Sequence, residues 1–426
     1  MRILIKDAMI AGLDTEVVNR GYVLIEGEII KEAASGDYFG NTQELRIIDG
    51  KNYCIMPGLI NCHTHMAMTL LRGYGEGLSL MRWLNEKIWP MEARFKEEHI
   101  KIGTELALVE MLRSGTTTVN DMYFIQDTVK ECANDFNMRA VLGFPIMGND
   151  WEQLLNGYIG SVNSINSIES DMCKAMLAPH SAYTLTADAL KGIAEAAKQY
   201  NCGIHIHVSE TEDEQKIVMD RYRKSPAELL LDSGVFDVNT IAAHCVYLSD
   251  SDMDIIKSKG VNPVYNPQSN MKLASGTARV MDMLNRNINV CLGTDGASSN
   301  NNLNMFGEME TGALLQKLYY KDSTVLSGKK VLEIATVNGA RALGFNNLGR
   351  IKPGCYADLI MINLNKPSMT PVHDIYSNIA FSANGSEVEY VIINGKIVME
   401  KGRFTAIDEE RVIFESRKVV EKLLKD

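Results

Sequence analysis

The chain has 426 residues, a formal net charge of -11 and a composition that is 46% hydrophobic and 23% charged. This length is too great for one small core and predicts a large domain with a smaller one. The acidic balance, with no basic stripe, argues against nucleic-acid binding. Eight cysteines are scattered without a Cys-x-x-Cys spacing, which argues against both a disulfide framework and a cysteine-ligated zinc site.

The first 56 residues are predicted to form a small β-sheet. Short alternating or β-branched segments lie near residues 3–11, 21–25, 29–33 and 45–48. Glu26-Gly27 supplies a tight turn between the second and the third. The N-terminus lacks the apolar core of a signal peptide, and no apolar run is long enough to span a membrane. We therefore expect a cytoplasmic protein without a membrane partner.

From Pro57 onward, strand-like runs alternate with amphipathic helical patterns. Eight strands over about 240 residues have the length and order of a (β/α)8 TIM barrel, in which the chemistry lies at the carboxyl ends of the strands. The helical patterns include residues 100–113, 187–200, 227–232 and 305–319. The predicted strands are 58–63, 116–120, 139–144, 174–178, 203–208, 240–244, 260–265 and 289–292.

After residue 344 the chain returns to β character. A strand is predicted at 357–362, a hairpin at 388–393 and 396–399 with Asn394-Gly395 at its turn, and a charged helix at 409–425. Because β-rich segments flank the barrel on both sides, we expect them to form one domain. The predicted division is a discontinuous small β-sandwich domain of residues 1–56 and 350–426, and a metal-dependent barrel of residues 57–349.

Five of the eight histidines fall at predicted strand ends, namely His63, His65, His180, His207 and His244. One such histidine is more often a hydrogen-bonded structural residue, but five together favour a metal site. His63 and His65 follow the apolar run 53–60, which is predicted as one short buried strand. In extended backbone their side chains point to the same side and can bind one ion together.

A second His-x-His lies at residues 205–207. His207, nearer the rim of the barrel, is predicted to be a metal ligand, whereas His205, one layer deeper, is predicted to be structural or to support the ligands. Glu210 follows three residues later and could hold a water and transfer its proton. A charge at a helix N-terminus explains Glu210 equally well at this stage.

Asp295 ends the eighth strand in the sequence Gly293-Thr294-Asp295-Gly296. Alone it would be a solvated turn aspartate. Together with three histidines it supplies the fourth protein group of a site that keeps one position open for water. His244, at the end of the run 240–244, would orient or polarise that water.

The motifs at residues 57–65, 207–210, 243–245, 266–273 and 293–296 resemble those of the amidohydrolase superfamily. Within it they are most similar to the 5-methylthioadenosine/S-adenosylhomocysteine deaminases, and the resemblance covers nearly the whole chain. It implies one divalent metal, first of all Zn²⁺, with Fe²⁺ and Mn²⁺ also compatible with the ligand set. The implied ligands are His63, His65, His207 and Asp295.

The resemblance also implies roles for the other site residues. Glu210 would pass a proton to the purine N1, while His244 and Asp295 would hold and deprotonate the attacking water. His180 matches a histidine that contacts the purine ring. Glu92 matches a carboxylate that binds the ribose diol, although from the sequence alone it would be a charge at the start of a helix.

The predicted function is therefore hydrolytic deamination of an adenine nucleoside to the inosine analogue and ammonia. The candidate substrates are 5-methylthioadenosine, S-adenosylhomocysteine, adenosine and 5'-deoxyadenosine. Family members that accept S-adenosylhomocysteine bind its carboxylate with arginines after the third barrel strand. This chain has no arginine between Arg139 and Arg221, so an uncharged 5'-substituent is expected.

Three alternatives stay open at this stage. The chain could deaminate a free base such as guanine or 8-oxoguanine, or hydrolyse a triazine-type compound. It could also be a scaffold that kept the barrel and lost catalysis, although the predicted ligands and Glu210 are all present. A homo-oligomer is expected, because a partner chain could complete the substrate pocket.

Overall fold

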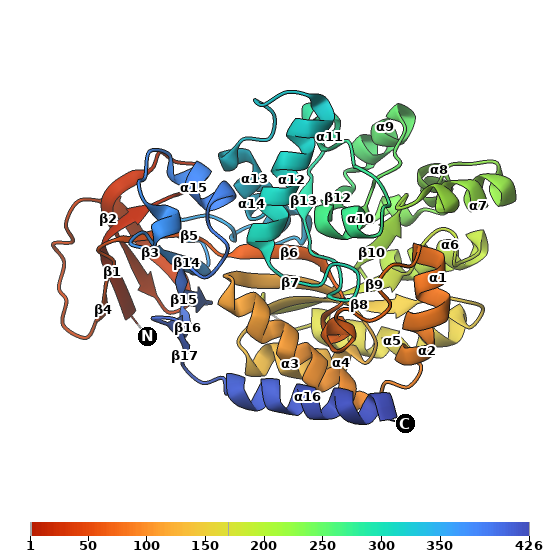
Figure 1. Cartoon of the computed structure of the whole chain (residues 1–426), viewed down its shortest axis with the longest axis horizontal. Helices are drawn as coiled ribbons and strands as arrows, with labels where there is room; N and C mark the ends of the chain where they lie inside the picture. The colour runs from red at the N-terminus through yellow and green to blue at the C-terminus, as the bar shows by residue number, and fades with distance from the viewer. Residues whose placement is uncertain (1, 169, 426) are drawn as a thin grey trace.

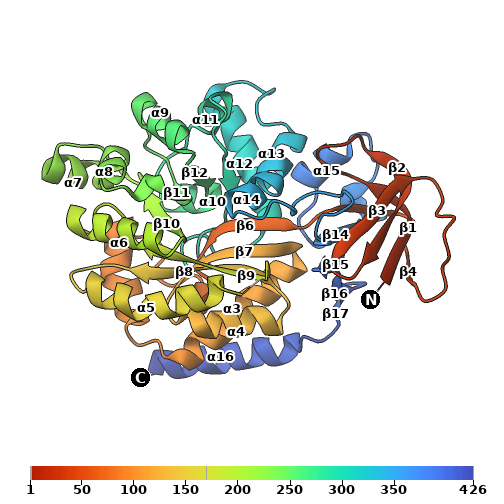
Figure 2. The same cartoon turned by 180° about the vertical axis from the view of Figure 1, so that it is seen from behind.

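The computed structural model describes residues 2–168 and 170–425. Residues 1 and 426, the outer ends of the predicted small domain, lie outside the described residues. The strands form two sheets, one of eight strands and one of nine, and the sheets lie side by side (Figures 1 and 2). Within the described residues, no helix combines the length and the apolar character needed to cross a lipid bilayer.

The eight-stranded sheet is parallel between all neighbours, in the sequence order that a barrel requires. The amide of Asp295 donates to the carbonyl of His63 (2.9 Å) and links its first and last strands. The predicted fold class is confirmed, and each predicted barrel strand matches an observed one. These are β6 (Leu59–Thr64), β7 (Thr116–Met122), β8 (Arg139–Ile146), β9 (Cys173–Pro179), β10 (Gly203–Val208), β11 (Thr240–His244), β12 (Asn262–Tyr265) and β13 (Cys291–Leu292).

Helices surround the barrel and connect its strands (Figure 2). The segment after β6 contains the short helix η1 (Met66–Leu71) and then one continuous helical run made of α1 (Leu80–Trp83), the π-helix η2 (Leu84–Ile88) and α2 (Trp89–Glu92). The others are α3 (Glu97–Arg113), α4 (Gln126–Asp135), α5 (Trp151–Asn166), α6 (Ala187–Gln199), α7 (Glu212–Tyr222), α8 (Pro226–Asp232), η3 (Val235–Asp237), α9 (Asp250–Lys259), α10 (Pro267–Lys272), α11 (Val280–Asn285), α12 (Met305–Tyr320), α13 (Gly328–Ile334) and α14 (Val337–Ala342).

The nine-stranded sheet draws its strands from both ends of the chain. Its order is β17-β16-β15-β14-β5-β1-β2-β3, with β4 paired to β1, so it is one continuous path of paired strands. Between β14 and β15 the chain forms η4 (Pro367–Met369) and α15 (Ile375–Phe381). Its strands are β1 (Arg2–Ile10), β2 (Val18–Glu26), β3 (Ile29–Ser35), β4 (Arg46–Asp49), β5 (Tyr53–Pro57), β14 (Leu359–Asn363), β15 (Val388–Ile393), β16 (Lys396–Glu400) and β17 (Arg403–Phe404).

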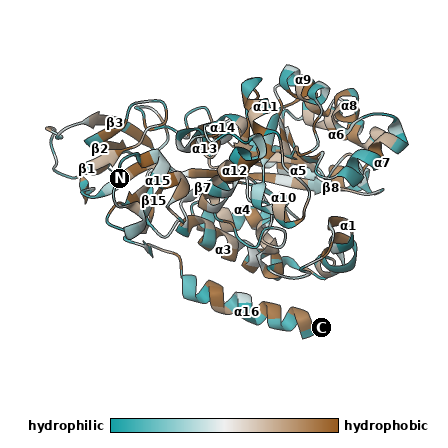
Figure 3. Ribbon diagram, turned by 45° about the horizontal axis from the view of Figure 1, so that its top comes forward, coloured by the Kyte–Doolittle hydropathy of each residue, from teal (hydrophilic) through white to brown (hydrophobic). Residues whose placement is uncertain are grey.

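The last helix, α16 (Glu409–Lys425), leaves the nine-stranded sheet and runs along the barrel helix α3 (Figure 1). Figure 3 shows it in alternating hydrophilic and hydrophobic bands. Val412, Ser416 and Leu423 are buried, at spacings that place them on one side of the helix. The amphipathic pattern thus attaches the end of the chain to the outside of the barrel.

The run predicted as a single strand over residues 53–60 is in fact two strands in two different sheets. β5 ends at Pro57 in the nine-stranded sheet and β6 begins at Leu59 in the barrel. Gly58 lies between them, and its amide donates to the carbonyl of Asp358 (3.0 Å). A Cβ at Gly58 would lie 2.1 Å from Oγ1 of Thr117, so no side chain fits where the chain crosses between the sheets.

A buried ion pair joins the two sheets close to this crossing. Arg139, the first residue of β8, donates through Nε and Nη2 to the two carboxylate oxygens of Asp358 (2.8 and 3.0 Å). The two side chains are 0% and 1% exposed. The guanidinium also lies over the ring of Tyr356, 4.7 Å from its centroid. This bidentate geometry satisfies both charges in a region that excludes water.

Candidate metal centre and active site

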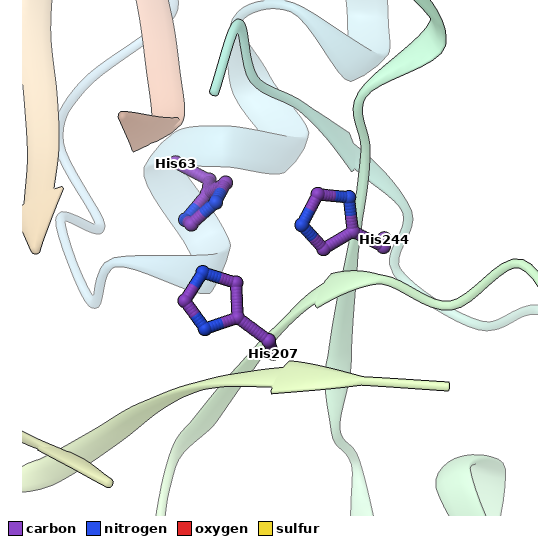
Figure 4. A group of neighbouring side chains, drawn as sticks. All are labelled: His63, His207 and His244. Atoms are coloured by element: carbon purple, nitrogen blue, oxygen red, sulfur yellow. The ribbon is translucent and has the colours of Figure 1, made fainter. Parts of the chain in front are cut away.

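Four histidines and one aspartate converge at the carboxyl end of the barrel strands. His63 and His65 come from the end of β6, His207 from β10, His244 from β11 and Asp295 from the turn after β13. Figure 4 shows the rings of His63, His207 and His244 facing a common centre. Two overlapping groups, His63-His207-His244 and His63-His65-Asp295, each bring their ligand atoms within 4.8 Å of one another.

The donor atoms of this cluster fit a divalent metal ion. Nε2 of His63 and Nε2 of His65 lie 3.3 and 3.2 Å from Oδ1 of Asp295, and Nε2 of His207 lies 3.4 Å from Nε2 of His65. Nε2 of His63 is buried and has no hydrogen-bond partner. Three imidazoles and a carboxylate aimed at one point form a set of ligands that Zn²⁺ and related ions accept.

Hydrogen bonds on the far side of each ring decide which nitrogen is free for the ion. Nδ1 of His65 donates to the carbonyl of Met122 (2.6 Å), and Nδ1 of His207 donates to the carbonyl of His180 (2.8 Å). Nδ1 of His63 lies 2.9 Å from Nε2 of His205. In each ligand Nδ1 is therefore engaged, which leaves the Nε2 lone pair directed at the centre.

His244 has the opposite tautomer. The side-chain amide nitrogen of Asn270 donates to Nδ1 of His244 (2.9 Å), so the proton of the neutral ring is on Nε2. That N–H points toward the cavity and lies 3.8 Å from Oε2 of Glu210. Although His244 is close enough to bind the ion, its hydrogen bonding makes it a donor to a water or a substrate atom.

Burial keeps most of these imidazoles neutral. Desolvation lowers the pKa of His63 and of His244 to about 4, and it lowers the pKa of His207 well below its ordinary value. His65 differs, because the hydrogen bond and the charge of Asp295 outweigh desolvation and raise its pKa. A metal ion at this position would take the place of the proton that His65 shares with Asp295.

Asp295 is held as a carboxylate by several donors. The hydroxyls of Ser269 and Ser299 donate to Oδ2 (2.6 and 2.8 Å), and the amide of Gly296 donates to Oδ1 (2.8 Å). Desolvation alone would raise the pKa of Asp295, but the imidazoles of His63 and His65 beside its carboxylate hold it well below its ordinary value. Asp295 is therefore a fixed, buried carboxylate and not a solvated turn residue.

Two residues of the cluster have a left-handed backbone. His244 has φ 73° and Asp295 has φ 61°, a region that L-residues with large side chains rarely occupy. Such conformations persist only where the surrounding structure enforces them, and they concentrate at functional sites. Here they turn both side chains from the ends of their strands toward the centre.

Glu210 lines the cavity and lies one residue before the N-cap of α7. The N-cap of α7 is Thr211, whose side chain accepts from the amide of Glu214, so Glu210 precedes the helix. Its side chain lies beside His244, and the hydroxyl of Ser275 donates to Oε1 (3.5 Å). Desolvation, with the charge of Asp295, raises its pKa to about 8. This shift favours the protonated form of the carboxyl group, which can donate a proton.

The remaining predicted residues, Glu92 and His180, line the same cavity as the cluster. Glu92 ends α2, and its Oε1 accepts a hydrogen bond from the hydroxyl of Tyr123 (2.6 Å). Trp83, Trp89 and other apolar side chains form a wall that suits a flat aromatic ligand. The cavity is lined by His65, Met68, Leu80, Trp83, Leu84, Trp89, Glu92, Met122, Tyr123, Phe124, Pro145, Met147, His180, Tyr183, His207, Glu210, His244, Leu273, Asp295 and Ser299.

Several residues that hold the site had no predicted role. Tyr123 directly follows the end of β7, where a strand-end search could have found it. Ser269 and Asn270 lie within the motif at 266–273, but their contacts depend on where the chain folds. His205 had two open interpretations, and its contact with His63 supports the second, a residue that supports the ligands.

Comparison with known proteins agrees with this geometry. The model of the amidohydrolase family matches residues 54–398, which is most of the chain. The chain belongs to the amidohydrolase family. It is therefore an enzyme with the metal-dependent hydrolase fold of that family, as the resemblance implied.

Curated relatives and a solved structure narrow the similarity. A 5-methylthioadenosine/S-adenosylhomocysteine deaminase of Clostridium tetani (strain Massachusetts / E88) is 56% identical over 417 residues, covering 97% of each chain. A 5'-deoxyadenosine deaminase of Methanosarcina mazei is 42% identical and covers 99% of this chain and 98% of that protein. The crystal structure of an adenosine deaminase from Xanthomonas campestris with bound Zn has a TM-score of 0.95 at 30% identity, covering 100% of this chain and 99% of that one.

Proposed function

We propose that this amidohydrolase deaminates an adenine nucleoside hydrolytically, giving the inosine analogue and ammonia. The observation that carries the proposal is the position of Glu210, a buried carboxyl group with a raised pKa beside His244 and the convergent ligands. Deamination needs a proton donor for N1 of the purine and a held water beside C6, and these groups supply both. The relatives named above act on nucleosides of this class.

The proposed ligands of the ion are His63, His65, His207 and Asp295, with Zn²⁺ as the first candidate, as in the zinc-bound relative. When bound, a divalent metal lowers the pKa of a water toward neutrality. Asp295 would accept the first proton of the attacking water, and the N–H of His244 would fix the oxygen. The water oxygen would bond to C6, and the bond from C6 to the amino nitrogen would break as Asp295 returns its proton to that nitrogen, so that ammonia leaves. The added hydroxyl would become the C6 carbonyl, and its proton would restore Glu210.

Recognition of the nucleoside would use the rest of the cavity. Glu210 in its protonated form donates to N1, which makes C6 electrophilic. His180 contacts the purine, and Glu92 accepts hydrogen bonds from the ribose hydroxyls. Glu92 favours a nucleoside over the alternative free-base and triazine substrates, because those have no diol for a carboxylate to bind.

We further propose that the 5'-substituent is uncharged. None of the residues that line the cavity in the described part of the chain is a lysine or an arginine. The adjoining apolar cavity shares Trp89, Glu92, Phe124 and Met147 with it and also has no basic lining residue. A carboxylate placed there would lose its hydration without gaining a partner, and it would lie near Glu92.

Cytoplasmic location and homo-oligomer formation stay predictions. An exposed apolar row on α12 supports self-association, since Leu314 and Leu318 are 50% and 75% exposed and lie one turn apart. Light scattering of the purified protein measures the oligomeric state directly. A monomer at micromolar concentration would contradict the predicted oligomer.

The proposed reaction is tested with Glu210→Gln. We expect this variant to keep its bound metal and to lose turnover by about 100-fold or more, because the amide cannot transfer a proton. Ammonia release from adenosine, 5-methylthioadenosine and guanine is measured together with metal content on the same samples. Deamination of guanine but not of adenosine by the wild-type enzyme would reject the nucleoside assignment.

A further inference from the structure

Two consecutive residues at the end of β7 contact two different parts of the site. The carbonyl of Met122 accepts a hydrogen bond from Nδ1 of the metal-ligand candidate His65 (2.6 Å). The hydroxyl of the next residue, Tyr123, donates to Oε1 of Glu92 (2.6 Å). One strand end therefore connects the metal centre to the carboxylate proposed to bind ribose.

Tyr123 is itself held rigidly. Its side chain is 3% exposed, and its ring lies 5.1 Å from the ring of Phe124 and 6.4 Å from that of His65. Its carbonyl accepts a hydrogen bond from the side-chain amide of Gln126 (3.0 Å), which also donates to Asp121 (3.0 Å). The phenol therefore has a fixed position relative to β7.

Glu92 lies at the very end of its own helical segment. It is the last residue of α2, which continues α1 and the π-helix η2 without a break over residues 80–92. Its side chain has three rotatable bonds, whose freedom costs free energy to restrict. Among the described residues, the phenol of Tyr123 is the one hydrogen-bond partner found for the Glu92 carboxylate, and it leaves Oε2 free.

We propose that Tyr123 is the positioning residue for recognition of the ribose 2',3'-diol. Its phenol holds Glu92 so that Oε2 and the remaining lone pairs of Oε1 face the two hydroxyls. Because Tyr123 and Met122 are adjacent on β7, this strand end fixes how far the ribose lies from the metal ligands. Preference for ribosides over nucleosides without the diol therefore depends on Tyr123. This role rests on the proposed deamination of nucleosides.

The test compares two substrates that differ only in the diol, adenosine and 2',3'-dideoxyadenosine. In Tyr123→Phe the ring is kept and the donor is lost. We expect KM for adenosine to rise about tenfold, as for the loss of a hydrogen bond to a charged group, with kcat changed by less than about twofold. The kcat/KM for 2',3'-dideoxyadenosine should change by less than about twofold, because no diol is present.

A double variant distinguishes the positioning of Glu92 by Tyr123 from a general structural effect of the substitution. In Glu92→Gln the charged partner is gone, so adding Tyr123→Phe should cost less than about twofold more in kcat/KM for adenosine. Tyr158→Phe is the matched control. It removes only the hydroxyl of Tyr158 on α5, whose ring packs on Phe144 outside the cavity. The kcat/KM for both substrates should stay as in the wild type. Metal content and the urea midpoint establish that each variant is folded.

Three outcomes would overturn the proposal. Equal losses for both substrates in Tyr123→Phe would mean that Tyr123 supports the pocket in general. An unchanged KM for adenosine would mean that Glu92 needs no positioning by the phenol. Absence of turnover of any adenine nucleoside by the wild-type enzyme would reject the proposed function and this role together, whereas the first two outcomes leave the function intact.

Discussion

Nδ1 of His63 lies 2.9 Å from Nε2 of His205, so one buried imidazole orients another. For Nε2 of His63 to be free for the ion, its Nδ1 must donate and His205 must accept. The proton of His205 is then on its own Nδ1, which is buried without a partner. Gly143 faces that atom, since a Cβ there would lie 3.3 Å from it. The packing of the barrel interior therefore makes room for His205, although His205 itself does not reach the ion.

Replacement of His205 by alanine should therefore weaken metal binding. The supporting shell of a metal ligand typically contributes about 10- to 100-fold in affinity, and we expect a loss of that size for Zn²⁺. Competition with a chelator measures the dissociation constant. His205→Gln keeps a hydrogen-bond acceptor and should recover part of the affinity. Wild-type affinity in His205→Ala would show that His63 needs no such partner.

The apolar lining around Met147 predicts a preference among nucleosides. The kcat/KM should be at least about tenfold higher for 5-methylthioadenosine than for S-adenosylhomocysteine, because the latter would place a carboxylate in a cavity without a cation. Met147→Arg should lower the ratio of kcat/KM for 5-methylthioadenosine to that for S-adenosylhomocysteine. Phe39→Arg adds the same charge at a loop residue that is 93% exposed and should leave the ratio unchanged. A wild-type preference for S-adenosylhomocysteine would reject the uncharged 5'-substituent.

Glu92 gives the activity a pH dependence of known sign. Desolvation raises its pKa to about 7, against the lowering effect of the Tyr123 hydrogen bond. The group is ionised above this pKa and neutral below it, and the ionised form is the better acceptor for the diol. The ratio of kcat/KM for adenosine to that for 2',3'-dideoxyadenosine should therefore fall as pH decreases through about 7. Titrating groups that affect both substrates equally cancel in this ratio. In Glu92→Gln the ratio should no longer change with pH.

The buried pair of Arg139 and Asp358 predicts a stability effect. Arg139→Met leaves a buried carboxylate without its partner and should lower the free energy of unfolding by about 3–5 kcal/mol. The double variant with Asp358→Asn removes that charge and should be less destabilised than Arg139→Met alone. Arg82→Met breaks an exposed pair with Glu86 and should leave the free energy of unfolding nearly unchanged. Urea unfolding measures all three, and equal losses for Arg139→Met and Arg82→Met would contradict the prediction.

The sequence predicted the barrel and the convergence of polar side chains at its strand ends because both follow local rules. Strand runs can be read from their own residues, and the rule that chemistry lies at strand ends brings His63, His207 and Asp295 together without any coordinates. The crossing between the sheets at Gly58 was not predicted, because an apolar run of residues looks the same in the sequence whether it lies in one sheet or is divided between two. The break depends on segments distant in the sequence, such as Asp358, which accepts from the Gly58 amide, and Thr117, which leaves no room for a side chain at Gly58.

The contacts that support the site could not be predicted for a similar reason. Tyr123 and Glu92 are far apart in the sequence, and the bond between them depends on where α2 packs against the end of β7. Ser269 and Ser299 look like ordinary loop serines until the turn after β13 places Asp295 between them. Such positions are set by tertiary packing and not by any local periodicity.

The central place of β5 in the nine-stranded sheet also has a consequence for synthesis of the protein. β5 pairs with β14 on one side and with β1 on the other, yet β14 follows the whole barrel in the chain. While the ribosome is still making the barrel, β5 presents an unpaired apolar edge that can pair with other chains. In a truncated or fused chain that lacks β14, this edge of β5 stays exposed. The strands at the end of the chain therefore protect those near its beginning from aggregation.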